Sequence, residues 1–376
     1  MQLAMVAGEA SGDLLGGALL AGLRQRWPQL RAAGIGGPQM AAQGFAAWWP
    51  HEKLAVRGYV EVLRHYREIS AIREALAARL LADRPQVFIG VDAPDFNLGL
   101  EARLKAAGIK TVHFICPSIW AWRGGRAKKM VASCDHVLCL FPFEPALLAQ
   151  HGVAATFVGH PLADSIPLVA PRAAARAALG LSDSDAVVAV MPGSRRSEIS
   201  AIAPAFLQAA MRLHQRRPDL RFLLPVAPGL RALLDPLVAE HAAGLPLQML
   251  DGQSHRALAA CDVTLIASGT ATLEAALFKR PMVIGYRMHP ISWQIMKRMR
   301  YQPWVGLPNI LLRDFAVPEL IQEHCQPAAL AQAALAWLDD AAGCERLARR
   351  FDDLHHLLRR DTARCATDAI AQILQF

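Results

Sequence analysis

VFIGVDAPDFN, residues 87–97, indicates the fold, because the apolar run 87–91 leads directly into a loop that carries Asp92 and Asp95. Three other stretches share this design: AMVAGEASGD at 4–13, VVAVMPGSRRSE at 187–198 and VTLIASGTATLE at 263–274. Continuous apolar runs of this length are typical of parallel strands buried on both faces. The carboxyl ends of such strands form the ligand crevice of an open α/β sheet. Because the design occurs twice in each half, we predict a two-lobed α/β protein with its chemistry at these four loops.

The composition limits the class of protein. With 376 residues and 53% apolar residues, the chain is long enough for two cores. The net charge of +8 favours an anionic partner, either nucleic acid, a phosphorylated substrate or an acidic membrane surface. The seven cysteines are scattered without a CxxC pair, so we expect reduced thiols and no zinc site. We find no signal peptide and no apolar run near the roughly 20 residues that span a bilayer, and therefore expect a cytoplasmic protein.

Strand-like runs alternate with helical patterns along both halves of the chain, and the proline-bearing segment 161–171 separates the halves. The alternation predicts parallel sheets with crossover helices. In the first half we expect strands at 4–7, 32–36, 87–91, 111–115, 136–140 and 156–158. In the second half we expect them at 187–191, 221–226, 247–250, 263–267 and 282–286.

Three regions follow from this alternation: a first lobe at 1–165, a second lobe at 172–345, and terminal helices at 346–376 that pack back toward the first lobe. Two Rossmann-like lobes that face a central cleft are the arrangement of the glycosyltransferase B fold. Periplasmic-binding-type folds and some epimerases share this arrangement.

Two loops of the second half favour a phosphate ligand. Arg195 in PGSRRSE lies at the start of a predicted helix, where the helix dipole and a guanidinium together neutralise a diphosphate. The small residues Ser268, Gly269 and Thr270 in SGTATLE let backbone N–H groups approach a phosphate, and Glu274 is placed to accept ribose hydroxyls. The structural alternatives are a helix-capping turn with a solvated arginine and a tight cap with a helix-stabilising glutamate.

The loops of the first half are acidic. Asp92 or Asp95 in DAPDFN is a candidate general base, although Asp95 or Asn97 could instead cap the following helix. Glu9 and Asp13 in GEASGD would lie near the same edge. Crowded carboxylates of this kind can raise one another's pKa.

Several familiar motifs are absent from the sequence. It contains no GxxxxGK[ST] and no GxGxxG, which argues against GTPases and dehydrogenases, and no HExxH or GxSxG. A DxD triplet at 183–185 precedes a strand in linker-like sequence, so we expect no metal there. The function predicted below needs no metal and no cofactor.

Three stretches combine aromatic or apolar residues with cations: PSIWAWRGGRAKK at 117–129, the helical pattern at 59–81, and HPISWQIMKRMRYQPW at 289–304. Basic amphipathic segments of this kind contact membrane surfaces or guide an acyl chain. Core packing with solvated cations is the alternative for each, and no nucleic-acid-binding signature accompanies them. The residues expected to contact an acceptor or a membrane are Trp120, Trp122, Arg123, Val60, Val62, Leu63, Tyr66, Ile69, Trp293, Lys297 and Arg298.

Taken in order and spacing, several motifs resemble the lipid-A-disaccharide synthase family. They are VAGEASGD, GVDAPDFN, PSIWAWR, FVGHPLAD, PGSRRSEI, ASGTATLEAAL, PMVIGYRM and VGLPNILL. The resemblance implies a glycosyltransferase B fold and an inverting, metal-independent transfer. The donor would be UDP-2,3-diacylglucosamine, and the acceptor 2,3-diacylglucosamine 1-phosphate, also called lipid X. The products would be the β-1,6-linked disaccharide 1-phosphate and UDP, formed on the cytoplasmic face of the inner membrane by a peripheral protein during lipopolysaccharide synthesis.

The resemblance also implies roles for single residues. Asp92 would be the general base, and Glu9 would lie near the acceptor or support Asp92. The donor nucleotide would be held by Arg195, Ser268, Gly269, Thr270, Glu274 and Asn309. Alternatives are another UDP-sugar enzyme of this fold, either an N-acetylglucosaminyltransferase or a 2-epimerase, and a non-catalytic nucleotide-lipid carrier. The choice between Asp92 and Asp95 as base, the acyl-chain lengths and a possible homodimer stay open.

Overall fold

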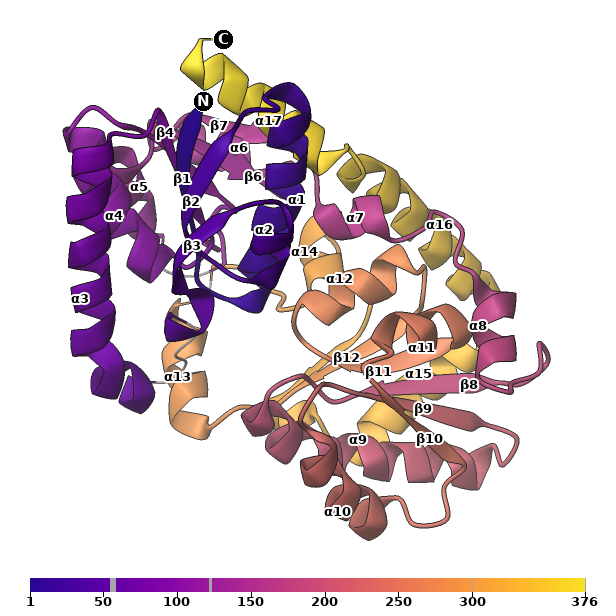
Figure 1. Cartoon of the computed structure of the whole chain (residues 1–376). Helices are drawn as coiled ribbons and strands as arrows, with labels where there is room; N and C mark the ends of the chain where they lie inside the picture. Colours follow the sequence, from indigo (N-terminus) through magenta and orange to yellow (C-terminus); the bar gives the residue numbers. More distant parts are fainter. Residues whose placement is uncertain (55–58, 122–123, 300, 376) are drawn as a thin grey trace. The chain divides into compact units, whose positions relative to one another are not determined.

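The computed structural model describes residues 1–54, 59–121, 124–299 and 301–375, with the backbone alone for Ala10, 59–66, 290–292 and Ile295. The chain divides into two compact units. Unit 1 comprises Met1–Asp164 and Leu358–Phe376, and unit 2 comprises Ser165–Leu357. Each unit is a parallel sheet with helices packed against its faces (Figure 1). The predicted α/β class with two parallel-sheet domains is thus confirmed.

The sheet of unit 1 has β1 and β4 at its centre, and both strands are almost fully buried. Burial on both faces explains why these strands read as unbroken apolar runs. The strand order is β3 (Ala46–Pro50), β2 (Arg31–Gly36), β1 (Gln2–Ala7), β4 (Val87–Val91), β5 (Lys110–Phe114), β6 (His136–Cys139) and β7 (Ala155–Phe157).

Alternate residues of these strands build two cores on opposite faces of the sheet. On one face, Leu3, Met5 and Ile89 pack with α1 and α17. On the other face, Phe88 packs with α3 and α4. The helices of this unit are α1 (Ala10–Arg26), α2 (Pro38–Ala42), α3 (Tyr59–Asp83), α4 (Pro94–Ala106), α5 (Arg126–Ser133), α6 (Glu144–Ala149), α7 (Pro161–Ser165, which ends one residue into unit 2) and α17 (Thr362–Leu374), with a 3₁₀ turn at His51–Lys53.

The sheet of unit 2 repeats the design with β8 and β11 at its centre. The strand order is β10 (Leu247–Asp251), β9 (Arg221–Val226), β8 (Val187–Met191), β11 (Val263–Ala267), β12 (Met282–Tyr286) and β13 (Glu319–Ile321). The core on one face joins Val188 and Leu265 to Phe206 of α9 and Leu330 of α15. The helices are α8 (Arg172–Ala178), α9 (Arg196–Arg216), α10 (Arg231–His241), α11 (Ser254–Ala260), α12 (Thr270–Leu277), α13 (Pro290–Met299), α14 (Leu307–Leu312), α15 (Pro327–Asp339) and α16 (Ala341–Leu358), with a 3₁₀ turn at Gln322–His324.

The helices expected at 346–376 are divided between the units. Almost all of α16 belongs to unit 2, whereas α17 packs along α1 in unit 1 (Figure 1). The start of α17 is held by Asp164 of α7. Its carboxylate accepts the N–H groups of Arg360, Asp361 and Thr362. Among the described residues, no helix has the length and apolar character needed to cross a bilayer. The seven cysteines are free thiols.

Candidate active site

Asp92 lies at the carboxyl end of β4 in a strained turn. Its φ is 51°, and Ala93, the next residue, has a φ of 44°. Left-handed conformations at residues other than glycine cost energy, and they concentrate at functional sites where the surrounding structure holds them. The turn is held from two sides: the N–H of Asp92 donates to the carbonyl of Phe114 at 2.9 Å, and Nδ2 of Asn97 donates to the carbonyl of Asp92 at 2.8 Å.

The neighbouring strand β5 ends in a second strained residue. Ile115 has a φ of 83°, which is exceptional for a β-branched side chain. Its N–H donates to the carbonyl of Leu138 on β6 at 3.0 Å. The conformation turns the chain from β5 into the PSIW segment. Strain therefore gathers at the carboxyl ends of β4 and β5, where the sequence predicted the acidic site.

Asp95 and Asn97 do not cap α4. The helix begins after Ala93 without a side-chain cap, and Asp95 is exposed and paired with Arg126 at 2.6 Å. Asn97 is fully buried and serves the Asp92 turn instead. Of the two candidate bases, Asp92 is therefore the half-buried residue at the strand end, and Asp95 is a solvated surface carboxylate.

The other acidic loop separates Glu9 from Asp13. Glu9 is half-buried at the N-cap of α1, directly after the loop that ends β1. Asp13 is buried, and its carboxylate accepts the N–H groups of Gly37, Gln39 and Met40 at the start of α2. Asp13 is thus a structural cap for α2, whereas Glu9 stays at the strand-end edge of the sheet.

Unit 2 has a pocket of about 390 Å³ at the carboxyl ends of β8, β9 and β11. The strand order reverses between β8 and β11, so the connections that follow these two strands run in opposite directions along the sheet. Ligands bind at such a point in open α/β sheets. Five of the six residues predicted to hold a donor nucleotide line it: Arg195, Ser268, Gly269, Thr270 and Glu274.

Arg195 is the N-cap of α9 and forms a reciprocal cap with Glu198. Glu198 accepts the N–H groups of Ser194 and Arg195 through Oε2, and Oε1 lies 2.8 Å from Nη1 of Arg195. A side chain at Gly193, where φ is 121°, would collide with Glu198. The loop thus needs glycine, and it holds the half-exposed guanidinium of Arg195 at the rim of the pocket.

The loop at residues 268–270 leaves its backbone accessible. Gly269 has a φ of 154°, and a Cβ there would meet no atom within 4 Å, so the open space beside it lets another molecule approach the main chain. The hydroxyl of Ser268 donates to the carbonyl of Val305 at 3.0 Å. Oε2 of Glu274 lies 3.7 Å from Nε2 of His255, and this carboxylate raises the pKa of His255.

Asn309, the sixth residue expected to hold the donor nucleotide, is not among the residues that line this pocket. It is fully buried, and Oδ1 accepts the N–H of Val317 while Nδ2 donates to the Val317 carbonyl and to Oε1 of Glu319. Glu319 also accepts the N–H groups of Val305 and Gly306. Asn309 and Glu319 therefore hold the loop whose carbonyl binds Ser268. Glu319 was not predicted from the sequence.

The residues expected to contact an acceptor or membrane differ in their placement. Trp120 is buried, donates from Nε1 to Oε1 of Glu144 at 2.9 Å, and packs edge-on against Phe141 and Phe143. It therefore anchors its loop rather than offering a face to lipid. Ile69 packs against the core formed by α3 and α4. Trp122 and Arg123 lie outside the described residues, as do the side chains of Val60, Val62, Leu63 and Tyr66.

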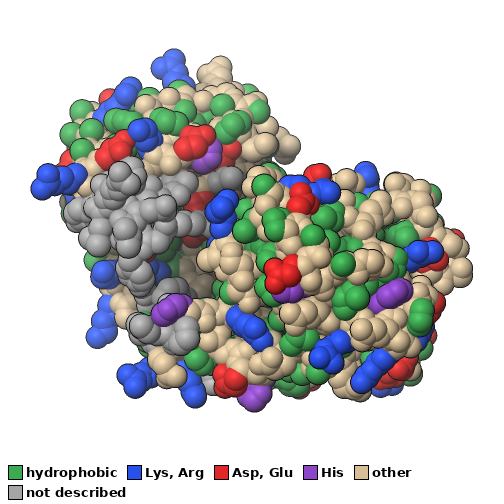
Figure 2. Space-filling view, turned by 90° about the horizontal axis from the view of Figure 1, so that it is seen from below, with side chains coloured by type: hydrophobic (Ala, Val, Ile, Leu, Met, Phe, Trp, Pro, Cys, Tyr) green, Lys and Arg blue, Asp and Glu red, His purple; other side chains and the backbone are tan. Residues whose placement is uncertain are grey.

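Helix α13 retains the features of a surface-binding helix. Lys297 and Arg298 are exposed, and Trp293 and Lys297 border a hollow of about 330 Å³ with Arg287. On the face drawn in Figure 2, the described Lys and Arg side chains are interspersed with Asp and Glu. On α13, Lys297 lies beside Trp293 at the rim of this hollow.

The described residues contain one group with metal-ligand spacing, formed by Glu101, His113 and Cys134. Both oxygens of Glu101 are already occupied, one by Nδ1 of His113 and the other by the thiol of Cys134. Burial and the charge of Glu101 raise the pKa of Cys134 far above its usual range, so it stays a thiol and is a poor ligand. In the DxD segment, Asp185 caps the N–H of Ser182 within its own turn.

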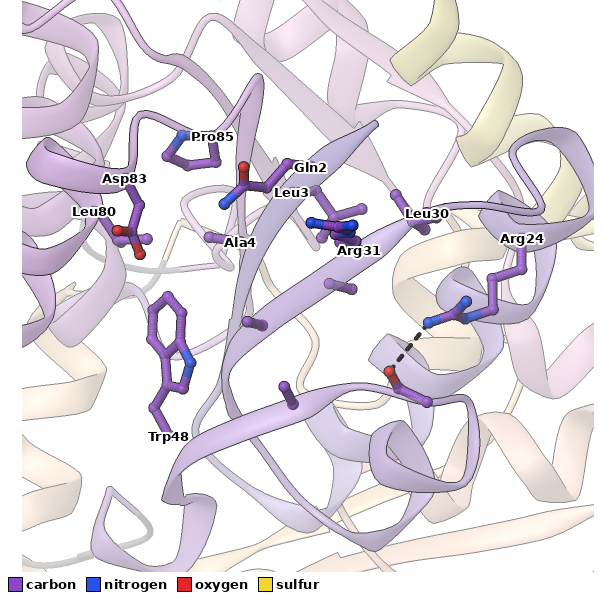
Figure 3. Close-up of a pocket in the computed structure, with 14 residues that line it drawn as sticks. Gln2, Leu3, Ala4, Arg24, Leu30, Arg31, Trp48, Leu80, Asp83 and Pro85 are labelled. Atoms are coloured by element: carbon purple, nitrogen blue, oxygen red, sulfur yellow. Dashed lines mark hydrogen bonds between the residues drawn. The ribbon is translucent and has the colours of Figure 1, made fainter.

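A further pocket of about 330 Å³ lies at the amino ends of the strands in the unit 1 sheet, opposite the ends that carry Asp92 and Glu9 (Figure 3). Gln2, Arg31 and Pro85 border it at the starts of β1 and β2 and just before β4, together with Trp48 and Asp83. Because chemistry in open α/β sheets gathers at the carboxyl ends of strands, this amino-end pocket is not the candidate active site.

Comparison with known sequences identifies the family. A family model described as lipid-A-disaccharide synthetase matches residues 3–372. The lipid-A-disaccharide synthase of Albidiferax ferrireducens is 60% identical over 380 residues, which cover 100% of this chain and 98% of that protein. The corresponding protein of Burkholderia pseudomallei is 56% identical over 376 residues, with 100% and 97% covered.

Solved structures agree on the fold. The UDP-GlcNAc 2-epimerase of Neisseria meningitidis, bound to UDP-GlcNAc, aligns with a TM-score of 0.67 at 10% identity and 100% coverage of both chains. MurG of Acinetobacter baumannii aligns with a TM-score of 0.58 at 15% identity, covering 100% of this chain and 99% of that one. These likenesses show the glycosyltransferase B fold, and the sequence relatives do not favour the epimerase or carrier alternatives. The chain belongs to the lipid-A-disaccharide synthase family and is a glycosyltransferase of lipid A biosynthesis.

Proposed function

We propose that the protein transfers 2,3-diacylglucosamine from its UDP derivative to the 6-hydroxyl of 2,3-diacylglucosamine 1-phosphate. The new bond joins the acceptor oxygen to the anomeric carbon of the donor, and the bond from that carbon to the diphosphate breaks. The hydroxyl proton goes to a base and UDP leaves. Attack opposite the leaving group inverts the α linkage to β. Family membership over residues 3–372 supports this reaction.

The observation that carries the assignment of roles is the left-handed turn at Asp92. A half-buried carboxylate at a strand end, held by Phe114 and Asn97, is well placed to receive a proton without rearrangement. Asp95 is a weaker candidate because it is exposed and paired with Arg126. Glu9, at the end of the adjacent strand β1, is proposed to orient the acceptor or support Asp92.

The pocket of unit 2 is proposed to bind the UDP portion of the donor. Negative charge develops on the diphosphate as it departs, so Arg195 and the backbone of Gly269 and Thr270 stabilise the transition state more than the bound substrate. Glu274 is proposed to accept the ribose hydroxyls. The size of the pocket, about 390 Å³, is within the range of small-ligand sites.

We also propose that the protein works as a peripheral protein on the cytoplasmic face of the inner membrane, because both substrates carry two acyl chains. The exposed cations of α13, next to Trp293, support a contact of this kind. Each Lys or Arg near an anionic lipid surface contributes about 1 kcal/mol to the free energy of membrane binding, so a small cluster of cations is enough for reversible binding.

Incubation of the purified protein with both substrates in detergent and EDTA tests the reaction. Mass spectrometry follows the disaccharide while a coupled assay follows UDP. We expect both products in equal amounts, with the β linkage seen by NMR. Binding of UDP without disaccharide, or hydrolysis of the donor alone, would contradict the proposal.

A further inference from the structure

A fully buried ion pair joins β5 to α4, the two elements whose backbone and side chains are bonded to the Asp92 turn. Nδ1 of His113 on β5 is 2.7 Å from Oε1 of Glu101 on α4, and both side chains have 0% exposure. The other carboxylate oxygen accepts the thiol of Cys134 at 3.2 Å. Charged groups are rarely buried so completely, because removing them from water is costly. Neither Glu101 nor His113 takes part in the proposed transfer, but both lie close to the proposed base, Asp92.

The backbone places the pair directly next to the turn. Gly90 on β4 is in register with His113 on β5, so both positions face α4. Asn97 and Glu101 are one helical turn apart on α4 and face this same patch. A Cβ at Gly90 would overlap Oε1 of Glu101 and crowd Asn97. Glycine at position 90, two residues before Asp92, is what lets the carboxylate of Glu101 reach the strand.

Neighbours of the pair hold Asp92 in its strained conformation. Phe114, the residue after His113, accepts the N–H of Asp92 at 2.9 Å. Asn97, one turn before Glu101, donates to the carbonyl of Asp92 at 2.8 Å. A movement of His113 or Glu101 would therefore shift the strand end or the helix start to which the turn is bonded.

The electrostatics connect His113 to Asp92 as well. Burial alone would lower the pKa of His113, but the charge and hydrogen bond of Glu101, together with the charge of Asp92, outweigh it and raise the pKa. The titratable groups around the pair are Asp92 at the turn and Cys134 after α5, with Lys105 and Asp135 adjacent to Cys134. Among the described residues, none accepts from the buried Nε2 of His113 or donates to Oδ1 of Asn97.

We propose that Glu101 and His113 are positioning residues that hold the Asp92 turn and place a positive imidazolium behind its carboxylate. The inference rests on the proposed role of Asp92 as general base. Glu101 keeps the imidazolium charged inside the core, and the charge of Asp92 contributes to this effect. A purely structural pair would fill the same space, but the protonation of His113 would not depend on Asp92.

The charge coupling is tested without altering the buried pair. In protein labelled with ¹⁵N-histidine, the ring nitrogens of His113 report its protonation as the pH is raised. We expect a doubly protonated ring with a midpoint above 6.5, and a lower midpoint in Asp92→Asn because the attracting charge is removed. A neutral ring at pH 6.5, or a midpoint that Asp92→Asn does not move, would overturn the inference.

Kinetics then test the positioning role. We expect His113→Gln and Glu101→Gln to lower kcat by about tenfold or more, with little change in KM for the donor. This loss is a part of the roughly 10²–10⁴-fold rate enhancement that a positioned general base contributes. We also expect the pH profile of kcat/KM to differ between His113→Gln and the wild type, because a charged group that interacts with Asp92 is removed. His136→Gln is the matched control, because His136 lies on the next strand and bonds Thr156 at 2.8 Å.

The outcomes separate the two claims. If Asp92→Asn keeps its turnover, the proposed base is wrong, whatever the buried pair does. If Asp92→Asn is inactive while folded His113→Gln keeps the wild-type kcat and pH profile, the proposed function stands and the positioning role is wrong. An equal loss in His136→Gln would show a general effect on the sheet and would also count against the inference.

Discussion

Nη1 of Arg195 lies 2.8 Å from Oε1 of Glu198, so the arginine proposed to meet the diphosphate is held by a carboxylate one turn along its own helix. Glu198 is buried, while the Arg195 side chain is 56% exposed at the rim of the unit 2 pocket. Gly193 leaves the space that this carboxylate occupies. The pairing fixes the guanidinium without hiding it, as a residue that must stabilise developing charge requires.

Removal of this guanidinium should slow transfer more than it weakens binding. We expect Arg195→Ala to lower kcat by about 10²–10³-fold, equal to roughly 3–4 kcal/mol. Arg196→Ala is the control, since Arg196 is exposed and does not border the pocket. Steady-state kinetics and UDP titration measure both. A rise in KM with unchanged kcat would assign Arg195 to ground-state binding alone.

Asn309 should matter for stability and not for direct contact with nucleotide. Asn309→Ala leaves the N–H and carbonyl of Val317 and an oxygen of Glu319 without their buried partner. We expect unit 2 to lose about 2–6 kcal/mol in urea unfolding, at about 1–3 kcal/mol for each of the two Val317 groups left unpaired, since Oε1 of Glu319 keeps the N–H of Gly306. A variant as stable as the wild type that no longer binds UDP would show instead that Asn309 contacts the ligand.

Glu144 should make the stability of unit 1 depend on pH. Burial raises its pKa to about 7 from 4.5, against the lowering effect of hydrogen bonds from Phe141, Trp120 and Leu140. A pKa raised in the folded state gives stability that is complete below about 4.5 and lost as the pH rises to about 7.

Wild-type protein should therefore lose on the order of 3 kcal/mol relative to Glu144→Gln between pH 5 and pH 8, at about 1.4 kcal/mol per pKa unit. Urea unfolding of unit 1 at the two pH values measures the difference. The exposed Glu345→Gln should show no such change. A stability difference that is the same at both pH values would contradict the ionisation of Glu144 in this range.

The cations of α13 should bind anionic membranes. Reversal of two charges in Lys297→Glu/Arg298→Glu should weaken binding to phosphatidylglycerol vesicles, by about 1 kcal/mol or more per cation at low salt. Arg346→Glu/Arg349→Glu on α16 makes the same charge change on another exposed helix. Vesicle sedimentation at two salt concentrations measures both. Equal losses in the two variants would leave only net charge as the cause.

The centre of each sheet could be predicted from the sequence, because strands buried on both faces are unbroken apolar runs. The edge strands β3 and β13 were not predicted: the residues of β3 are half-buried or exposed, and β13 has only three residues. The edge strands β7 and β10 have similar burial and were nevertheless predicted. The first helix begins at Ala10, so that Gly12 and Asp13 of the GEASGD loop belong to its first turns. Composition gives little sign of a helix that starts in a glycine-bearing loop.

The candidate site was predictable where residues follow strand ends, as Asp92 and Arg195 do. Their supporting residues were not, because Glu101, His113 and Glu319 lie inside helices or strands and meet their partners only in the fold. Glu198 was the exception: it follows Arg195 by three residues, the spacing of a reciprocal helix cap. Asn309 was assigned from family resemblance alone, and its burial and its hydrogen bonds to Val317 and Glu319 could not be read from its position in a motif.

A comparison of Asp92→Asn with Asp95→Asn in the disaccharide assay, with UDP-donor binding measured for both, shows which carboxylate is the base. If Asp92 is the base, its variant binds donor like the wild type and transfers about 10²–10⁴-fold more slowly. Asp95→Asn, which changes a solvated carboxylate three residues away, keeps its rate. Near-normal transfer by folded Asp92→Asn, or loss of transfer in Asp95→Asn alone, would contradict the account.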